Sequence, residues 1–157
     1  MRANSNSLIL NKAKQEDWKE ILNLLEEANL IDRVSGNGTF DSFFTVKDTD
    51  NKIISCFAIN QNNDIGILKS FAVRKNLRGF GIGKSIVEKI STLAKDIGLK
   101  KLYAASWEAP GFWIKTSFKE INPFESEDEF FIKYRDYLEE NYPQFADTKK
   151  YFLLILI

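Results

Sequence analysis

Apolar and polar residues follow two different periods along this chain, and together they predict a mixed series of strands and helices. β-branched and aromatic runs between turn residues predict strands over 7–13, 40–46, 52–60, 65–73, 101–105, 118–121 and 151–157. Apolar residues spaced three and four apart predict helices over 17–28, 82–97, 110–116 and about 126–141, with a short helix or loop over 29–39. The sequence therefore predicts an α/β protein.

The connections between these segments indicate how the strands pair. Polar residues at 48–51 and 61–64 are typical of tight turns, so the strands between 40 and 73 are expected to be antiparallel. A strand at 101–105 that follows a helix is expected to lie parallel to the strand 65–73. The last apolar run, 151–157, is expected to close the sheet.

Several residues mark the expected helix ends. Asp17 with Glu20, and Ser126 with Glu129, have the spacing of capping boxes. Gly98 stands where a left-handed residue ends a helix, Pro110 suits a first helical turn, and Pro143 ends the helix before it. At 157 residues without repeats or a low-complexity linker, the chain is expected to be a single domain over 1–157.

The segment 78–84, Arg-Gly-Phe-Gly-Ile-Gly-Lys, carries most of the functional signal. Glycines spaced two apart allow positive φ and let a ligand approach the backbone closely. The helix that follows points unpaired N–H groups and its positive dipole end toward the same place, which favours an anion. With Arg78 and Lys84 at its two ends, the segment predicts a phosphate or pyrophosphate site.

Spacing separates three kinds of phosphate loop. A P-loop needs G-x-x-x-x-G-K-[ST]; Gly83, Lys84 and Ser85 supply its end, but Arg78 stands where its first glycine belongs. A dinucleotide fingerprint needs G-x-G-x-x-G, and Lys84 or Ile86 occupies the position of its third glycine. The pattern that fits is R-x-x-G-x-G.

This pattern, formed by Arg78, Gly81 and Gly83 after the strand segment 68–73, resembles the acyl-CoA pyrophosphate loop and fourth strand of the GNAT superfamily of N-acyltransferases. The predicted order of elements is similar to that family over almost the whole chain, with an extra helix at about 126–141 before the last strand. A second match compares 106–113 with the family's N-x-x-A-x-x-F-Y, and 117–118 with the G-F pair that follows it in the family. Ala109, Phe112 and Phe118 match the family pattern. The pattern differs at three positions, where Ser106 replaces asparagine, Trp113 replaces tyrosine and Ser117 replaces glycine.

The resemblance implies a mixed, mostly antiparallel central sheet with helices on both faces. A splayed parallel pair of strands would form the coenzyme A slot. The resemblance also implies direct attack of a primary amine on the thioester of acetyl-CoA. The cofactor-binding residues that it implies are Phe71, Ala72, Val73, Arg78, Gly79, Phe80, Gly81, Ile82, Gly83, Lys84, Ser106, Phe112 and Trp113. Arg74 and Lys75 are the nearest candidates for the ribose phosphate.

The proton-transfer groups do not follow from the resemblance. Trp113 replaces the family's usual tyrosine, and an indole N–H does not ionise in the working range. Ile67 occupies the position of a glutamate often found on the fourth strand. Candidates for a replacement acid or base are Glu108, Ser106 and Tyr103, with a chain of water molecules as an alternative. A non-catalytic acyl-CoA-binding or regulatory module is a second interpretation.

Composition excludes several chemistries. The chain has 22 basic and 22 acidic residues, so no overall charge favours nucleic acid or an anionic membrane. It has no histidine, which excludes a histidine base or zinc ligand, and its one cysteine excludes an internal disulfide. Cys56 is expected to be a buried strand residue. No metal site is expected.

Local charge and the chain ends complete the expectations. Basic residues predominate over 66–101, which suits a polyphosphate cofactor, and acidic residues predominate over 120–140. If that acidic segment lines the acceptor site, a cationic amine acceptor is favoured, such as a polyamine, an aminoglycoside-like amine or a lysine side chain. The expected partners are a small-molecule or peptide amine, without nucleic acid or membrane; a homodimer is allowed. A polar start and a short apolar end predict a cytoplasmic protein.

Overall fold

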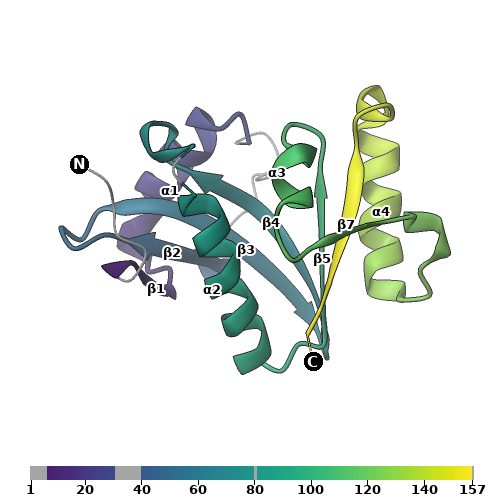
Figure 1. The fold of residues 1–157 in the computed structure, drawn as a ribbon, viewed down its shortest axis with the longest axis horizontal. Coiled ribbons are helices and arrows are strands. Elements are labelled where there is room, and N and C mark those ends of the chain that lie inside the picture. The colour runs from purple at the N-terminus through teal and green to yellow at the C-terminus, as the bar shows by residue number, and fades with distance from the viewer. Residues whose placement is uncertain (1–6, 31–39, 80, 157) are drawn as a thin grey trace. The chain divides into compact units, whose positions relative to one another are not determined.

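The computed structural model of this chain describes residues 7–30, 40–79 and 81–156 (Figure 1). Within them, seven strands form one sheet in the order β1-β2-β3-β4-β5-β7-β6. The strands are β1 (Ile9–Lys12), β2 (Phe43–Lys47), β3 (Ile53–Asn62), β4 (Ile65–Val73), β5 (Lys101–Ser106), β6 (Lys119–Ile121) and β7 (Lys150–Ile155). The α-helices are α1 (Trp18–Glu27), α2 (Ile82–Asp96), α3 (Pro110–Ile114) and α4 (Glu129–Asn141). The predicted α/β class is confirmed.

The chain divides into two units, whose boundary passes through β3, β4 and α2. The first unit comprises the described residues of Met1–Ile59 and Lys69–Lys89. The second comprises those of Asn60–Leu68 and Ile90–Ile157. The single domain expected from the sequence stays a prediction.

In the first unit, β1, β2 and β3 are antiparallel neighbours. Ile9 pairs with Lys47 between β1 and β2, and Phe43 pairs with Ala58 between β2 and β3. The connection 48–51 is the expected hairpin turn, because the Asp48 carboxylate accepts the N–H of Asp50 at 2.9 Å and of Lys52 at 3.0 Å. A side-chain oxygen that bonds its own turn in this way fixes the register of both strands.

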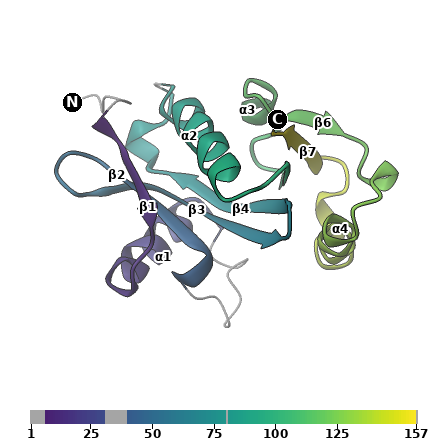
Figure 2. The same cartoon turned by 90° about the horizontal axis from the view of Figure 1, so that it is seen from below.

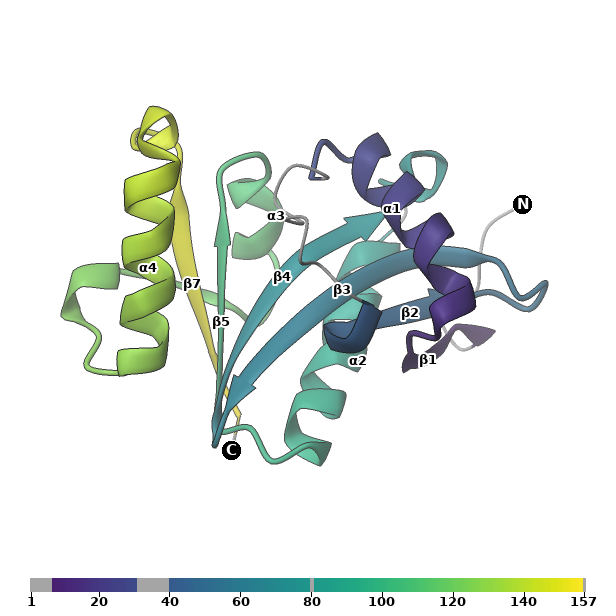
Figure 3. The ribbon, with the colours of Figure 1, turned by 180° about the vertical axis from the view of Figure 1, so that it is seen from behind.

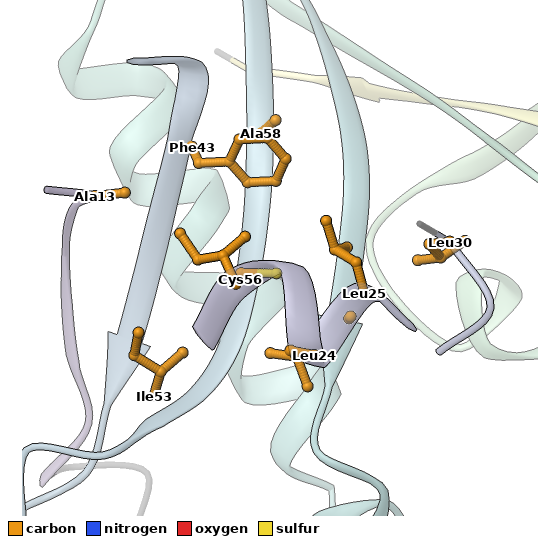
Figure 4. Packing of buried hydrophobic residues seen from close by; sticks show 10 residues of the cluster. Ala13, Leu24, Leu25, Leu30, Phe43, Ile53, Cys56 and Ala58 are labelled. Carbon is orange, nitrogen blue, oxygen red and sulfur yellow. The ribbon is translucent and has the colours of Figure 1, made fainter. Parts of the chain in front are cut away.

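Two helices cover the two faces of these strands: Figure 2 shows α1 and the start of α2 on opposite sides of β1, β2 and β3. Leu24 and Leu25 of α1 are completely buried and point toward the β3 residues Ile53, Cys56 and Ala58 (Figure 4). Burial of each leucine stabilises the folded state by about 1.5–3 kcal/mol. Cys56 is buried in the same cluster, and its burial raises the pKa of its thiol to about 12. Cys56 is thus a core residue, as expected.

In the second unit, β4 and β5 form the predicted parallel pair, from Ile65 beside Lys101 to Leu68 beside Ala104. β7 is antiparallel to β5 and to β6, and therefore lies between them. The expectation that the last strand closes the sheet was wrong, because β6 takes the edge. Figure 3 shows β7 between β5 and α4.

Helices also cover both faces of the second unit. Successive strand residues point to opposite faces, so the neighbours Tyr151 and Phe152 mark the two sides of β7. Phe131 of α4 packs edge-on to Tyr151, with ring centroids 5.8 Å apart. The ring centroid of Trp113 in α3 lies 6.1 Å from the ring centroid of Phe152. The mixed, mostly antiparallel sheet with helices on both faces is confirmed.

Some predicted boundaries differ from the structure. The strand expected from residue 40 begins at Phe43, because Phe40–Ser42 forms a 3-10 turn. The capping box at Asp17 is absent, since its carboxylate accepts the N–H of Lys14 at 2.9 Å and pairs with Lys47 at 3.1 Å. Residues 31–39 of the expected helix or loop lie outside the described residues.

Other helix ends follow the sequence more closely. Gly98 has φ +89° just after α2, and Pro110 is in the first turn of α3. Asp128, not Ser126, is the N-cap residue of α4, and the Ser126 hydroxyl instead accepts the Asp128 N–H at 3.2 Å. None of the helices in the described part of the chain has the length and apolar character needed to cross a bilayer.

Candidate functional site

The second half of β4 departs from regular strand geometry at Ser70, whose φ is +53°. The surrounding contacts hold the strand on both sides of this residue. Cys56 donates its S–H to the Ser70 carbonyl at 3.8 Å, and Ser55 donates its hydroxyl to the Ala72 carbonyl at 2.7 Å. A non-glycine residue with positive φ costs about 1–3 kcal/mol and is typical of functional sites. Serine within a strand pattern carries no such signal, so the sequence analysis missed it.

The chain after β4 is tied to its own unit. Arg74 donates through Nε to the Ile53 carbonyl at 2.8 Å. Its Nη2 lies 3.7 Å from the Glu20 carboxylate. The Lys75 N–H donates to the Glu27 carboxylate at 2.6 Å. Both expected ribose-phosphate residues are therefore held by contacts with α1 or β3.

Arg78 folds back over the end of β4. Its Nε donates to the Val73 carbonyl at 3.0 Å, and its side chain is exposed. This bond uses only one of the guanidinium donors, and the guanidinium fork presents several more. The positive charge expected at the start of the glycine loop is thus held next to the strand end.

The glycine loop has the backbone geometry that the sequence predicts. Gly79 has φ +87° and Gly81 has φ +77°, and a Cβ added to either would meet no described atom within 4 Å. These glycines are therefore required by backbone conformation, not by packing, and the space over them is open. Phe80, between them, lies outside the described residues.

The start of α2 follows at once. The Ser85 N–H donates to the Gly81 carbonyl at 3.1 Å, so the N–H groups of Ile82, Gly83 and Lys84 come before the helix's first i to i−4 bond. Ile82 is buried, which anchors this turn. A 15-residue helix that begins here directs its dipole at the loop, and this arrangement suits an anion.

The remaining candidate residues belong to the second unit, at the end of β5 and in α3. Ser106 is buried, and its hydroxyl accepts the Ala109 N–H at 3.1 Å, which shapes the turn into α3. Glu108 is exposed in that turn. The ring of Trp113 is buried and packs edge-on to Phe112 at 5.3 Å and to Phe118 at 5.0 Å. Trp113 is thus part of the core of its unit.

Tyr103 is engaged in a polar cluster on the other face of β5. Its hydroxyl donates to the Asp128 carboxylate and lies 3.2 Å from the Ser126 hydroxyl, and its ring stacks on Phe131 at 4.0 Å. Lys101 pairs with the same carboxylate at 3.1 Å. Burial and the hydrogen bond to Asp128 raise the pKa of Tyr103 to about 12. Asp128 cannot be recognised from the sequence, because its role depends on the packing of α4.

Strand alternation separates the candidate catalytic residues. Tyr103 and Ser106 are three positions apart on β5, so their side chains point to opposite faces. Ser106 and Glu108 lie together in the turn before α3. In the described residues, no group of three or more acidic or cysteine side chains is arranged to hold a metal ion.

Comparisons with known proteins agree with this fold. The family model for the acetyltransferase (GNAT) family matches residues 8–111. An amino-acid acetyltransferase of Mycobacterium tuberculosis is 30% identical over 71 residues, which cover 45% of this chain and 40% of that protein.

Solved structures extend the similarity to nearly the whole chain. The N-acetylglutamate synthase of Neisseria gonorrhoeae, crystallised with coenzyme A and N-acetyl-glutamate, has a TM-score of 0.74 at 18% identity, over 96% of this chain and 35% of that one. A GNAT acetyltransferase of Staphylococcus aureus has a TM-score of 0.67 at 15% identity, over 96% and 99% of the two chains. The chain thus spans well under half of the first relatives it matches in sequence or structure. With a family model that covers more than half of its length, this chain belongs to the GNAT acetyltransferase family.

Proposed function

We propose that this chain transfers the acetyl group of acetyl-CoA to a primary amine of a small-molecule or peptide acceptor. The observation that carries the proposal is the glycine loop at the start of α2, where Gly79 and Gly81 have positive φ and open space above them. The family membership supports the same cofactor, and the related Neisseria synthase was crystallised with coenzyme A.

Coenzyme A would be held first by its pyrophosphate. In this proposal, the N–H groups of the first turn of α2 bond the phosphate oxygens, as helix N-termini commonly do. Arg78 and Lys84 add positive charge from the two ends of the loop. Gly79 and Gly81 both matter, because a side chain at either position would be strained at its positive φ.

The thioester carbonyl would then be polarised by the backbone of β4. A left-handed residue turns the next peptide out of the regular strand direction, and Ser70 does so just before Phe71. We place an N–H of the Phe71, Ala72 and Val73 segment on the thioester oxygen. A preorganised donor of this kind lowers an acyl-transfer barrier by about 3–4 kcal/mol.

Acetyl-CoA supplies an activated acetyl group, and the protein has to bring the amine to it and remove one proton. The amine nitrogen forms a bond to the carbonyl carbon as the carbon–sulfur bond breaks, which gives the amide and the coenzyme A thiolate. Orientation alone can lower such a barrier by about 7–11 kcal/mol. The three acid–base candidates from the sequence are Glu108, Ser106 and Tyr103, and of these side chains a carboxylate is the one that can accept the amine proton directly or through water at neutral pH.

The two other acid–base candidates have local structural roles. Ser106 accepts the Ala109 N–H, and Tyr103 already donates to Asp128. Because the pKa of Tyr103 is raised, its hydroxyl gives up a proton less easily than an ordinary tyrosine. Trp113 does not ionise, so in this proposal the thiolate takes its proton from solvent.

The cationic acceptor expected from the acidic segment 120–140 loses part of its support. Asp128 pairs with Lys101 at 3.1 Å and Glu139 pairs with Lys149 at 2.6 Å. Glu120 lies 3.7 Å from Lys150. Carboxylates already paired with lysine attract a further cation less strongly.

A non-catalytic acyl-CoA-binding module is the second candidate. The observation that favours it is Ile67, an apolar and buried residue at the position where the family often has a glutamate. Release of free coenzyme A thiol in the presence of a panel of primary amines separates the two candidates. Amine-dependent release supports the transferase; binding of acetyl-CoA without release for any amine supports the binding module.

The finer expectations stay predictions. They are the cytoplasmic location, the homodimer and the absence of nucleic-acid or membrane partners. Size measurement in solution tests the homodimer directly.

A further inference from the structure

Ser55 of β3 is a completely buried serine whose hydroxyl donates to the Ala72 carbonyl of β4 at 2.7 Å. Serine is mostly exposed in proteins, and a hydroxyl that is buried is kept where it makes a hydrogen bond. This bond reaches β4 two residues after the left-handed Ser70, where the strand departs from regular geometry. Ser55 therefore fixes the direction of one peptide of β4 just after the bend.

Three backbone groups of β4 point toward β3 around this bend. The Ala72 carbonyl accepts the Ser55 hydroxyl, and the Ser70 carbonyl accepts the Cys56 thiol at 3.8 Å. Burial raises the pKa of the Cys56 thiol, and a hydrogen bond from the Ala72 backbone opposes that rise. An N–H donor lowers the pKa of a thiol because it stabilises the thiolate. Ala72 thus directs both its carbonyl and its N–H toward β3.

The geometry of the peptide bond then gives the direction of the Val73 N–H. The peptide between Ala72 and Val73 is trans, so its N–H points opposite to its carbonyl and away from β3. A strand residue directs its N–H and its carbonyl to the same side. The Val73 carbonyl accepts Arg78 Nε at 3.0 Å. The Val73 N–H therefore points to the edge of β4 where Arg78 and the start of the glycine loop are held.

The next step rests on the proposed function. In that proposal, the thioester arm of acetyl-CoA runs beside the Phe71–Val73 backbone, and the arm offers amide and thioester carbonyl oxygens as acceptors. The Ala72 N–H is directed toward β3, whereas the Val73 N–H is directed away from it. A hydrogen bond to the carbonyl of a peptide also polarises the N–H of that peptide, which makes the N–H a stronger donor.

We infer that Ser55 is a positioning residue of the cofactor site: it holds the Ala72–Val73 peptide so that the Val73 N–H donates to a carbonyl oxygen of the acetyl-CoA arm. Ser55 itself does not touch the cofactor in this assignment. Arg78 holds Val73 from the other side through its carbonyl. A buried serine and a charged loop residue thus fix one backbone donor together.

The test observes the Val73 amide directly by NMR. The chain has four valines, so protein labelled with isotopic nitrogen in valine alone gives few amide signals, and Val73→Ile identifies the one that belongs to Val73. The ligands are acetyl-CoA, coenzyme A and the nucleotide part of coenzyme A, which keeps the pyrophosphate and lacks the arm. Calorimetry on the same samples gives the affinities and needs no turnover.

The proteins are the wild type, Ser55→Ala, Ser55→Thr and a matched control, Thr45→Val. Ser55→Thr keeps the hydroxyl. Thr45 lies in β2 of the same unit, and its buried hydroxyl has no hydrogen-bond partner among the described residues. Thr45→Val therefore removes a buried hydroxyl without removing a contact to β4.

In the wild type, acetyl-CoA should move the Val73 amide proton downfield, and the nucleotide part should not. Ser55→Ala should lose most of this shift and bind acetyl-CoA about three- to tenfold more weakly, with an unchanged affinity for the nucleotide part. Ser55→Thr should restore the shift, and Thr45→Val should behave as the wild type. A purely structural role of Ser55 would lower the melting temperature of Ser55→Ala without this selective loss.

The two sources of the carbonyl are separated by the acetyl group. A Val73 shift with acetyl-CoA alone identifies the thioester carbonyl, and the same shift with coenzyme A identifies an amide carbonyl of the arm. Both results support the inference, because both place the Val73 N–H on the arm.

Two results would overturn the inference and leave the proposed function in place. One is a Val73 amide that does not move although acetyl-CoA binds; the other is the same shift in the wild type and in Ser55→Ala. If acetyl-CoA binds but no amine is acetylated, the proposed transfer fails, and the Val73 signal alone decides on Ser55. If neither acetyl-CoA nor coenzyme A binds, both proposals are rejected. If Ser55→Ala does not fold, Ser55→Cys takes its place, because a thiol is only a weak donor.

Discussion

The hydroxyl of Tyr103 donates a hydrogen bond to the carboxylate of Asp128, which joins the middle of β5 to the start of α4. Tyr103, a candidate acid from the sequence, therefore has a structural contact in the folded protein. This bond also shows why a tyrosine in a strand is a weak signal for catalysis: its partner comes from a helix 25 residues away in sequence.

Replacing Tyr103 with phenylalanine separates these two roles. The change leaves the stacking on Phe131 in place and removes one donor to Asp128, so we expect unfolding to become easier by about 1–3 kcal/mol. The kcat should stay within about threefold of the wild type. Denaturant melts and steady-state rates measure both effects, and Tyr137→Phe on the exposed side of α4 is the control. A large loss of kcat at unchanged stability would restore Tyr103 as a catalytic residue.

Two carboxylates should make the fold sensitive to acid. Burial raises the pKa of Asp128, but its bonds with Tyr103 and Lys101 outweigh burial and lower that pKa below 3.8. For Glu139, the hydrogen bond from Lys149 lowers the pKa below 4.5. A lowered pKa contributes stability that is present above the unfolded value and is lost as the pH falls through the folded value.

We therefore expect the melting temperature to fall as the pH drops below about 4.5, after a plateau at neutral pH. Asp128→Asn and Glu139→Gln should each melt earlier at pH 7 and show a shallower fall in acid. Thermal melts in steps between pH 7 and pH 2.5 check this. An unchanged acid slope in both variants would mean that other groups set the acid limit.

Gly81→Ala should damage cofactor binding more than folding. The variant introduces strain at φ +77° but no clash, so the loss of stability should be about 1 kcal/mol, while the KM for acetyl-CoA rises at least about tenfold. Gly98→Ala is the matched control, because it has φ +89° and equally open space at the far end of α2. It should lose similar stability with an unchanged KM. If Gly81→Ala and Gly98→Ala had the same KM for acetyl-CoA, the loop would not be part of the cofactor site.

Ser70→Gly should stabilise the protein. Glycine accepts φ +53° without strain, which should raise the unfolding free energy by up to about 1 kcal/mol, whereas Ser70→Val should lower it by more. The control is Ser91→Gly inside α2, which should destabilise by about 0.5–1 kcal/mol. Chemical denaturation of the three proteins gives the order. A destabilised Ser70→Gly would show that the serine side chain, not its backbone, matters at this place.

Local signals in the sequence predicted most of the fold. The period of the apolar residues identified every strand and α-helix of the described part to within a few residues, and Gly81 with Arg78 marked the loop. These features depend on short stretches of chain, which is why they are readable. The parallel pairing of β4 with β5 followed from the helix between them.

Non-local packing decided what the sequence did not show. Whether β7 or β6 takes the sheet edge depends on which strand pairs with β5, and that pairing is made between segments far apart in the sequence. The left-handed Ser70 and the burial of Lys69 depend on the neighbours of β4, and serine and lysine are ordinary residues in a sequence. Trp113 looked like a replaced catalytic tyrosine, and its packing against Phe118 gives it a core role.

The central claim is that the loop from Arg78 to Lys84 binds the pyrophosphate of coenzyme A. Calorimetry with coenzyme A and with pantetheine, which lacks the pyrophosphate and the nucleotide, tests it most directly on the wild type and on Gly81→Ala. The account expects coenzyme A to bind the wild type at least about 100-fold more tightly than pantetheine, and expects most of that difference to vanish in Gly81→Ala. Equal affinities for the two ligands in the wild type, or an unchanged difference in Gly81→Ala, would contradict it.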